Sequence, residues 1–349
     1  MRGPRLRAAC LCAAAGLSVA LRRSPGCSPE AVCLELHDRL GNNLYQLERG
    51  LWLALELRLC FLAVPTPVAK NPLASLLALP EDGVLRFGAA NLSAAEARKR
   101  CAVTCAACAP PRRAARSGLR ACSSWGPCDL GKRSLERPTV PMLRATVQDR
   151  IVPTSMFRCA GAGPGPGGLV MHLRSGDTLD ARSGFYPQPP CAFYAEVMER
   201  GAPGGFGAGL LVTEPDLEHP CLGPLLARFP GLRAQTGSVQ GDACTVASAE
   251  HLAIGFGTWG PALSRLNARL RSLHVPFGED NVSADAYGGS LARMSRHWFR
   301  QAVHEGPMPY EQLVYSFPGF RAEWSGRAEH AAAMRGYDQR RVVVRRIPA

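Results

Sequence analysis

The residues most able to do chemistry lie between Gly167 and Asp180, where a short apolar run ends in His172, Arg174 and Asp177. If Leu169 to Arg174 forms a strand, His172 and Arg174 share one face, because side chains alternate along a strand. A planar, permanently charged guanidinium at a strand end suits a phosphate or a carboxylate. Open α/β sheets hold ligands at the carboxyl ends of their strands. Taken alone, the stretch is also explained by an Arg174–Asp177 pair that braces a surface turn.

A second candidate site lies between His37 and Leu57, where a predicted strand runs through a glycine turn into a long amphipathic helix. Backbone N–H groups at the start of this helix would face ligands at the strand ends. Asn43, followed three residues later by Gln46, predicts a helix cap with a reciprocal partner. With Asn43 used as the cap, the amide of Asn42 is left to hydrogen-bond a ligand.

A third candidate site lies between Gly241 and Leu266. Its residues Gly255 to Gly260 separate a predicted strand from a predicted helix, and so offer a second helix N-terminus to a phosphate. Glycine-rich turns of this kind also occur for conformational reasons alone, and packing explains Trp259 better than chemistry does.

The elements that must hold these residues alternate between strand and helix beyond the low-complexity connector Gly161–Gly168. Such alternation predicts a mostly parallel sheet with helices on both faces. Strands are expected at Leu169–Arg174, Gly209–Thr213 and Leu252–Phe256, and helices at Cys191–Arg200, Pro220–Phe229, Ala243–His251, Pro261–Leu273 and Ser290–Val303. Before the connector, strands are expected at Ala31–Leu36 and Phe61–Val64, and helices at Asn43–Leu59 and Pro141–Val152.

The length of 349 residues and an ordinary globular composition, 46% hydrophobic and 20% charged, leave room for two domains. The connector predicts an N-terminal lobe over residues 28–160, with a cysteine-rich insertion, and a C-terminal lobe over 161–349. The second lobe is expected to end in a poorly ordered basic tail from Arg335. The net charge of +13 would suit a polyanion, but the Arg residues are scattered and no basic stripe with interleaved aromatics is visible. A small anionic substrate fits at least as well as nucleic acid.

The first 27 residues have the pattern of a signal peptide or a short signal anchor: three Arg, 14 uncharged residues from Ala8 to Leu21, then Arg22-Arg23. The absence of acidic residues before Glu30 leaves an organelle transit peptide as an alternative. Two glycosylation sequons, Asn91-Leu92-Ser93 and Asn281-Val282-Ser283, agree with the secretory route. We therefore expect a protein of the ER or Golgi lumen, anchored through its N-terminus or secreted.

Cysteine usage supports this compartment. Setting aside the two leader cysteines leaves 12, the even number that a disulfide framework requires. The close spacing of Cys105 and Cys108 would also allow a zinc site, but no second pair at matching spacing and no His lie nearby. Disulfides are therefore favoured over a metal.

The three candidate stretches, in this order, resemble the fucosyltransferase superfamily, whose members include α1,2-, α1,6- and protein O-fucosyltransferases. The matching segments are Arg39-Leu40-Gly41-Asn42, His172-Leu173-Arg174-Ser175-Gly176-Asp177 and Gly255-Phe256-Gly257-Thr258-Trp259. The α1,2 branch is the most similar, because its pattern also runs Arg-Leu-Gly-Asn and His-x-Arg-x-Gly-Asp. The chain departs from the family at Ser175, where members often carry a second Arg, and at Asn43, where they often carry Gln.

The resemblance implies an enzyme of two Rossmann-like lobes (GT-B-like) that transfers fucose from GDP-fucose to a glycan or protein acceptor with inversion and without a required metal. Arg174 would be catalytic, because a fixed cation stabilises the charge that grows on the leaving diphosphate. The lack of an Asp-x-Asp sequence agrees with metal independence. The implied donor-binding residues are Asn42, His172, Arg174, Asp242, Thr258 and Trp259, and the implied loop-ordering residues are Gly41, Gly176 and Asp177.

Two other functions stay open at this point. A secreted sugar-binding or scaffold protein could use the same fold without turnover, and the charge of +13 could serve a polyanion binder, whose affinity would fall steeply with salt.

Overall fold

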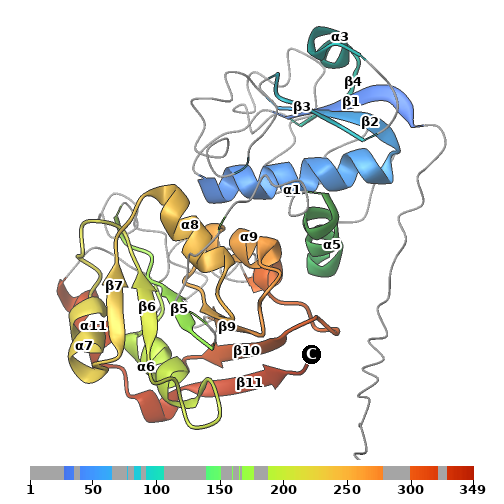
Figure 1. Cartoon of the computed structure of the whole chain (residues 1–349). Helices are drawn as coiled ribbons and strands as arrows, with labels where there is room; N and C mark the ends of the chain where they lie inside the picture. The colour runs from blue at the N-terminus through green and yellow to red at the C-terminus, as the bar shows by residue number, and fades with distance from the viewer. Residues whose placement is uncertain are drawn as a thin grey trace, which may run out of the picture.

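The computed structural model describes residues 27–34, 40–64, 77, 82–87, 92–105, 139–150, 159, 165, 167–176, 188–277, 299–320 and 328–349. In this part of the chain, a small and a large β-sheet lie on opposite sides of one long helix, α1 (Leu40–Glu56) (Figure 1). The leader, the asparagines of both sequons and most of the cysteine-rich insertion lie outside the described residues.

The small sheet has the strand order β3-β2-β1-β4, in which β1 runs parallel to β2 and β4. Strand β3 is antiparallel to β2. A parallel pair needs a crossover connection, and α1 supplies it between β1 and β2. On the outer face, Ala31 and Phe61 pack with Ala97 of α3 (Ala94–Lys99). The strands are β1 (Ser28–Leu34), β2 (Leu59–Ala63), β3 (Val84–Arg86) and β4 (Cys101–Cys105).

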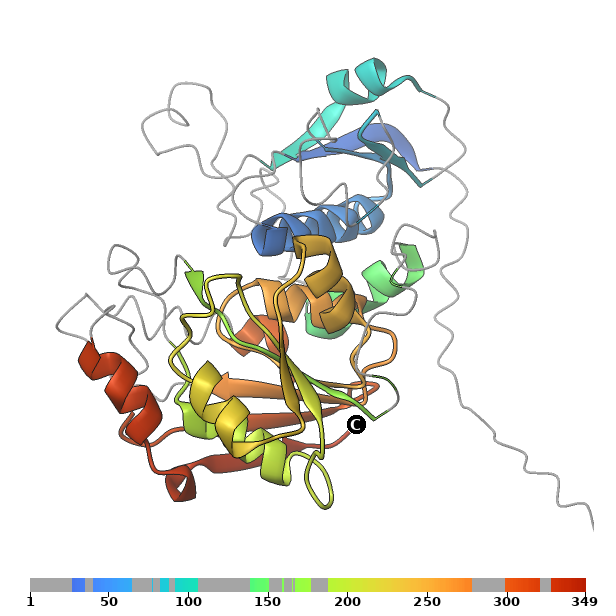
Figure 2. The ribbon, with the colours of Figure 1, turned by 60° about the vertical axis from the view of Figure 1, so that its left-hand side comes forward.

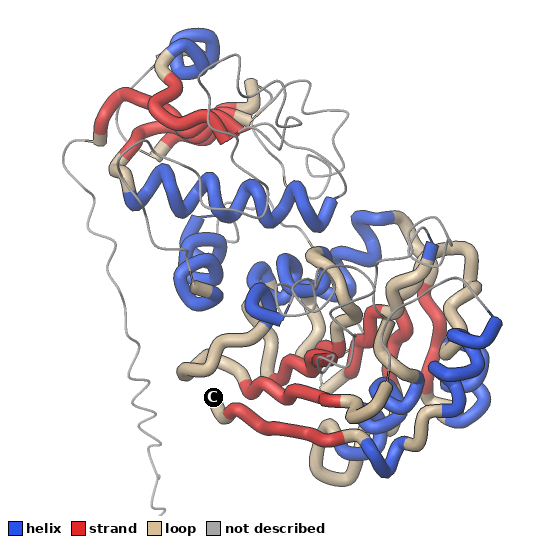
Figure 3. The backbone as a smooth tube through the Cα atoms, turned by 180° about the vertical axis from the view of Figure 1, so that it is seen from behind, coloured by secondary structure: helices blue, strands red, loops and turns tan. Residues whose placement is uncertain are grey.

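The large sheet has the order β11-β10-β9-β8-β5-β6-β7, and its pairs are parallel except for β10 with β11. Figures 2 and 3 show the sheet between two helical layers. One layer contains α6 (Cys191–Arg200), α7 (Leu222–Arg228) and α11 (Ala328–Gly336), and the other contains α5 (Val140–Arg150), α8 (Val239–Ala247) and α9 (Trp259–Leu266). The strands are β5 (Leu169–His172), β6 (Gly209–Val212), β7 (Leu232–Gln235), β8 (His251–Ala253), β9 (Ser272–Phe277), β10 (Glu311–Ser316) and β11 (Val343–Ile347).

The alternation predicted for β5 is present. Val170 packs into the hydrophobic core on the α8–α9 side, whereas Leu169, Met171 and Leu173 pack into the core on the α6–α7 side. Two buried faces explain why β5 is apolar along its whole length. The predicted fold class, an α/β protein of two Rossmann-like lobes with mostly parallel sheets, is confirmed.

One hydrophobic core runs through both lobes, because α1 is buried on two sides. Val32 and Leu62 of the small sheet, Leu47 of α1, and Leu263 and Leu273 of the large lobe belong to the same cluster. Twelve of the 17 residues of α1 are buried, too many for a helix with a single apolar face. The lobes therefore share this core, and each also has a cluster of its own on the face turned away from α1.

A buried ion pair crosses this shared core. Arg265 of α9 is fully buried, and its Nε donates a hydrogen bond of 2.8 Å to Oε2 of Glu48 on α1, which is 1% exposed. Nη1 of Arg265 donates to the carbonyl of Gln301 at 2.6 Å. Burial raises the pKa of Glu48 to about 7, against the lowering effect of Arg265. From α5, Arg144 and Gln148 donate to carbonyl groups at the C-terminal end of α9.

Within the described residues, four disulfides link eight cysteines, as expected of a protein that folds in an oxidising compartment. Cys101, from the cysteine-rich region, is one of them, but the side chains of Cys105 and Cys108 lie outside the described residues. The pairs are Cys27–Cys60, Cys33–Cys101, Cys159–Cys244 and Cys191–Cys221. Among the helices of the described ranges, none has the length and apolarity needed to cross a membrane.

Three sequence-based expectations about elements are wrong. Helix α1 begins at Leu40, so Asn43 lies inside its first turns and is not the cap. Helix α9 ends at Leu266, and Leu273 belongs to β9, because Asn267 takes an extended conformation and its side chain donates to the carbonyl of Ala249. The basic tail is ordered, since its β-branched residues form β11. Strands β3, β4, β7, β9, β10 and β11 were not expected from the sequence.

Removing the Arg265 side chain should destabilise the protein strongly, because Glu48 would stay buried without its counter-charge. We expect Arg265→Ala to lower the free energy of unfolding by about 3–5 kcal/mol, measured by chemical denaturation. The control is Arg345→Ala, which breaks an exposed pair with Glu305 and should cost less than about 1 kcal/mol. Equal losses for the two variants would contradict a special role for the buried pair.

Candidate functional site

The strand order of the large sheet switches direction between β5 and β8, the point at which an open α/β sheet is expected to form a crevice. From β5 the chain adds β6 and β7 on one side and then returns to add β8 and β9 on the other. Open α/β sheets bind ligands at such a switch point, outside the carboxyl ends of the strands. The segments that leave β5 and β8 at this edge are residues 173–176 and 254–258.

These two segments lie directly against each other. A Cβ atom at Gly255 would be 3.1 Å from the carbonyl oxygen of His172 and 3.6 Å from Cβ of Arg174. A side chain at position 255 would therefore press on the backbone of the β5 segment. Glycine here lets the β8 segment approach the residues that the sequence predicts to bind an anion.

Arg174 leaves β5 at the carboxyl edge of the sheet. Its side chain is 20% exposed, and Nη1 lies 2.9 Å from Oε1 of Glu214, in the segment after β6. Gly176, two residues on, has a φ of +60°, the left-handed region that glycine adopts without strain. Asp177 lies outside the described residues, so its loop-ordering role stays a prediction.

The N-terminus of α1 meets the N-terminus of α9 beside this crevice. A Cβ at Gly41 would lie 2.7 Å from both the N and Cα atoms of Trp259, so only glycine allows the two backbones to be this close. The hydroxyl of Thr258 donates a 2.7 Å hydrogen bond to Oδ1 of Asn42. Asn42 thus joins the two lobes.

His172 connects the β5 segment to this junction. Its ring lies 4.5 Å from the Trp259 ring, centroid to centroid, on the face that the alternation of β5 predicts. Burial, together with the charge of Arg174 and the neighbouring His219, lowers the pKa of His172 to about 3. His172 is therefore a neutral group at physiological pH, and its Nδ1 has no hydrogen-bond partner among the residues that the structure describes.

His219 is a second buried neutral imidazole, which sequence reasoning did not single out. Its Nδ1 accepts a hydrogen bond from the backbone N–H of Cys221 at 3.2 Å, so the ring proton sits on Nε2. Burial lowers its pKa to about 3, although Asp216 acts in the opposite direction. Its ring packs edge-on against Tyr194, whose hydroxyl donates to the carbonyl of His172.

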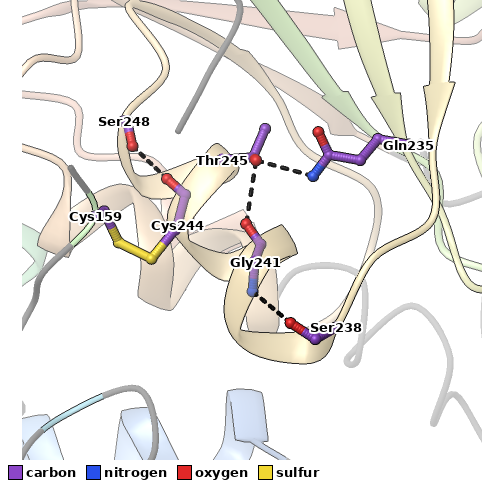
Figure 4. Close-up of a disulfide and its surroundings, with 7 residues drawn as sticks. All are labelled: Cys159, Gln235, Ser238, Gly241, Cys244, Thr245 and Ser248. Carbon is purple, nitrogen blue, oxygen red and sulfur yellow. Dashed lines mark hydrogen bonds between the residues drawn. A yellow bond between two sulfur atoms is a disulfide. The ribbon is translucent and has the colours of Figure 1, made fainter. Parts of the chain in front are cut away.

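Asp242, a predicted donor-binding residue, lies in the first turn of α8. Its carboxylate accepts from the Gln235 amide at 2.9 Å and from the backbone N–H of Gly237 at 3.2 Å. Helix α8 packs on α9 and β5, and a disulfide joins its Cys244 to Cys159 (Figure 4). The contacts seen for Asp242 are those of its own turn, and its binding role stays a prediction.

The structure thus brings five predicted residues together: Gly41, Asn42, His172, Thr258 and Trp259. Arg174 adjoins them through Gly255, while Asp242 is held in the β7–α8 turn. Sequence reasoning missed Glu214 and Asp216, which contact the β5 segment from the neighbouring strand. Across the described ranges, no three His, Cys, Asp or Glu side chains lie close enough together to hold a metal ion.

Fold and crevice together define an α/β protein of two Rossmann-like lobes with its candidate site at the switch point of the large sheet. No protein-family model and no curated protein matches the sequence. A similar solved structure is the crystal structure of NodZ α-1,6-fucosyltransferase soaked with GDP-fucose. It is 13% identical, with a TM-score of 0.38, over 92% of this chain and 100% of that chain. We therefore infer the function from the residues of this chain.

The buried histidines should make the protein acid-labile. His172, His219 and His274 each have a pKa lowered to about 3 by burial, so below the unfolded value of about 6.5 the unfolded state binds more protons. Stability should be complete above pH 6.5 and fall as the pH drops toward 3.

The test is His219→Asn, which keeps an acceptor for Cys221 but cannot titrate. The free energy of unfolding of this variant should change with pH less steeply than that of the parent, by up to about 1.4 kcal/mol per pH unit, between pH 4 and 6. Above pH 7 the two slopes should agree. Parallel curves over the acid range would show that His219 is not held neutral.

Proposed function

We propose that this chain is a glycosyltransferase that binds a nucleoside-diphosphate sugar, with GDP-fucose as its donor, at the carboxyl ends of β5 and β8. The observation that carries the proposal is that the segment with Arg174 lies against the β8 segment, which leads into α9 where the N-terminus of α9 meets that of α1. Backbone N–H groups and the helix dipole at these ends favour an anion. A guanidinium at the same edge of the sheet suits the two phosphates of the donor.

The same groups fit the chemistry of transfer. The bond between the sugar C1 and the diphosphate oxygen breaks, and its electron pair stays on the diphosphate. The acceptor hydroxyl oxygen bonds to C1 from the opposite face, with inversion, and gives up its proton to a base. Negative charge grows on the leaving diphosphate, so a preorganised cation such as Arg174 stabilises the transition state more than the ground state.

The identity of the sugar rests on the sequence resemblance to fucosyltransferases, and the acceptor is a glycan or a glycoprotein. The lumenal setting that the disulfides favour suits such acceptors. A polyanion-binding function is not supported, because basic residues near the C-terminus already pair with carboxylates. These pairs are Arg340–Asp338, Arg345–Glu305 and Arg346–Glu311.

Replacing Arg174 with Lys should impair both donor binding and turnover, because Lys keeps the charge but loses the planar fork. We expect weaker GDP binding and a fall in the rate of GDP-fucose hydrolysis or transfer of at least about a hundredfold. The control is Arg233→Lys, the same change at an exposed residue near the amino end of β7.

If Arg174→Lys folds normally and turns over GDP-fucose like the parent, Arg174 does not carry the diphosphate. If the parent binds GDP-fucose but produces neither hydrolysis nor transfer, the chain is a sugar-nucleotide-binding protein without turnover.

GDP binding should survive chelation, since Arg174 and the helix N-termini carry the diphosphate charge in this proposal. Titration of the protein with GDP in the presence and absence of EDTA should give the same Kd within about a factor of two. A large loss of affinity with EDTA that Mg²⁺ or Mn²⁺ restores would overturn metal-independent binding.

A further inference from the structure

The segment after β6 holds the Arg174 segment in place through one carboxylate. Oδ2 of Asp216 accepts a 2.8 Å hydrogen bond from the backbone N–H of Gly176, and Oδ1 accepts one of 3.1 Å from the hydroxyl of Ser175. Oδ1 also accepts from the backbone N–H of Glu218 at 3.2 Å, which ties the carboxylate to its own loop. Asp216 therefore holds in place the two residues that directly follow Arg174.

Further contacts restrain Ser175 and Gly176. Ser175 Oγ lies 3.1 Å from Thr213 Oγ1 and accepts from the backbone N–H of Glu214 at 3.3 Å. A Cβ atom at Gly176 would overlap the carboxylate of Glu214, which itself pairs with Arg174. The residues that follow β6 thus set the position of the residues that follow β5.

The charges around Arg174 help to separate an electrostatic role of Asp216 from a geometric one. Glu214, Asp216 and Glu218 place three carboxylates in the segment beside the proposed diphosphate site. Electrostatics alone would disfavour such charges near an anionic ligand, because like charges repel. Asp216 is nevertheless hydrogen-bonded to the segment that carries Arg174, so its contribution to donor binding should be geometric.

We propose that Asp216 is a positioning residue: by holding Ser175 and Gly176 it sets the direction in which Arg174 presents its guanidinium to the donor diphosphate. This role rests on the proposed function. It assigns the orientation of Arg174 to a residue that was not among the predicted site residues. A site held this way needs little rearrangement when the ligand arrives.

The test compares two substitutions that remove one negative charge from the same loop. Asp216→Asn also removes a hydrogen-bond acceptor from the β5 segment, whereas Glu218→Gln leaves the Ser175 and Gly176 hydrogen bonds intact. Positioning predicts that Asp216→Asn weakens GDP binding by roughly tenfold, the scale for losing a hydrogen bond to a charged group, and that Glu218→Gln binds GDP as tightly as the parent or more tightly. If charge alone mattered, both variants would bind GDP more tightly.

Isothermal titration with GDP gives the affinities, and hydrogen exchange at the Gly176 amide reports on its hydrogen bond to Asp216. Asp216 is exposed, so Tm without ligand should change by less than about 2 °C while the Gly176 amide exchanges faster. Kinetics with GDP-fucose should show a lower kcat as well as a higher KM, and Asp216→Glu, which keeps the carboxylate, should recover part of both.

The outcomes distinguish a failure of the positioning role of Asp216 from a failure of the proposed function. If the parent binds GDP and Asp216→Asn binds it equally well or better, Asp216 does not position Arg174, and the proposed function stands. A lower Tm with unchanged GDP affinity would make Asp216 a purely structural residue. If the parent binds no GDP, the proposed function falls and the positioning role falls with it.

Discussion

The burial of α1 between two sheets is the constraint on which the rest of the structure depends. Leu44, Leu47 and Leu51 are almost fully buried. Both lobes pack on α1, so separating either lobe from the helix would expose apolar side chains to water. Its one buried carboxylate, Glu48, requires the Arg265 guanidinium, because an isolated buried charge is too costly. The same packing brings the N-terminus of α1 to the N-terminus of α9, so the element that unites the lobes also builds the candidate site.

The electrostatics of the crevice follow from burial as much as from composition. His172 and His219 are kept neutral, so in the described part of the crevice the positive potential comes from Arg174 and from two helix N-termini. These are oriented groups whose positions are fixed by the sheet edge. Glu214 partly balances Arg174 and keeps it from being an isolated cation. The net charge of the chain, by contrast, says little about this site.

Regular periodicity made the central part of this architecture predictable from the sequence. The alternation of Leu169 to Leu173 identified both faces of β5, and glycine turns before helices identified the segments that meet around Trp259. Strand β11 was missed because its basic residues suggest a solvated tail, whereas their neighbours Glu305 and Glu311 compensate the charge only in the folded chain. Asp216 was missed because its hydrogen bonds to Ser175 and Gly176 span about forty positions, and no local spacing encodes them.

The shared core also has a consequence for biosynthesis. Disulfides Cys27–Cys60 and Cys33–Cys101 can close early on a growing chain, but the inner face of α1 packs on both α5 and α9, so it is fully covered only when α9 has been made. At about 5–20 residues per second, the roughly two hundred residues between these helices take on the order of 10–40 s to appear. For that interval the N-terminal part is a covalently closed unit with an incompletely covered apolar helix, so the yield of folded protein should depend on chaperones that bind such surfaces.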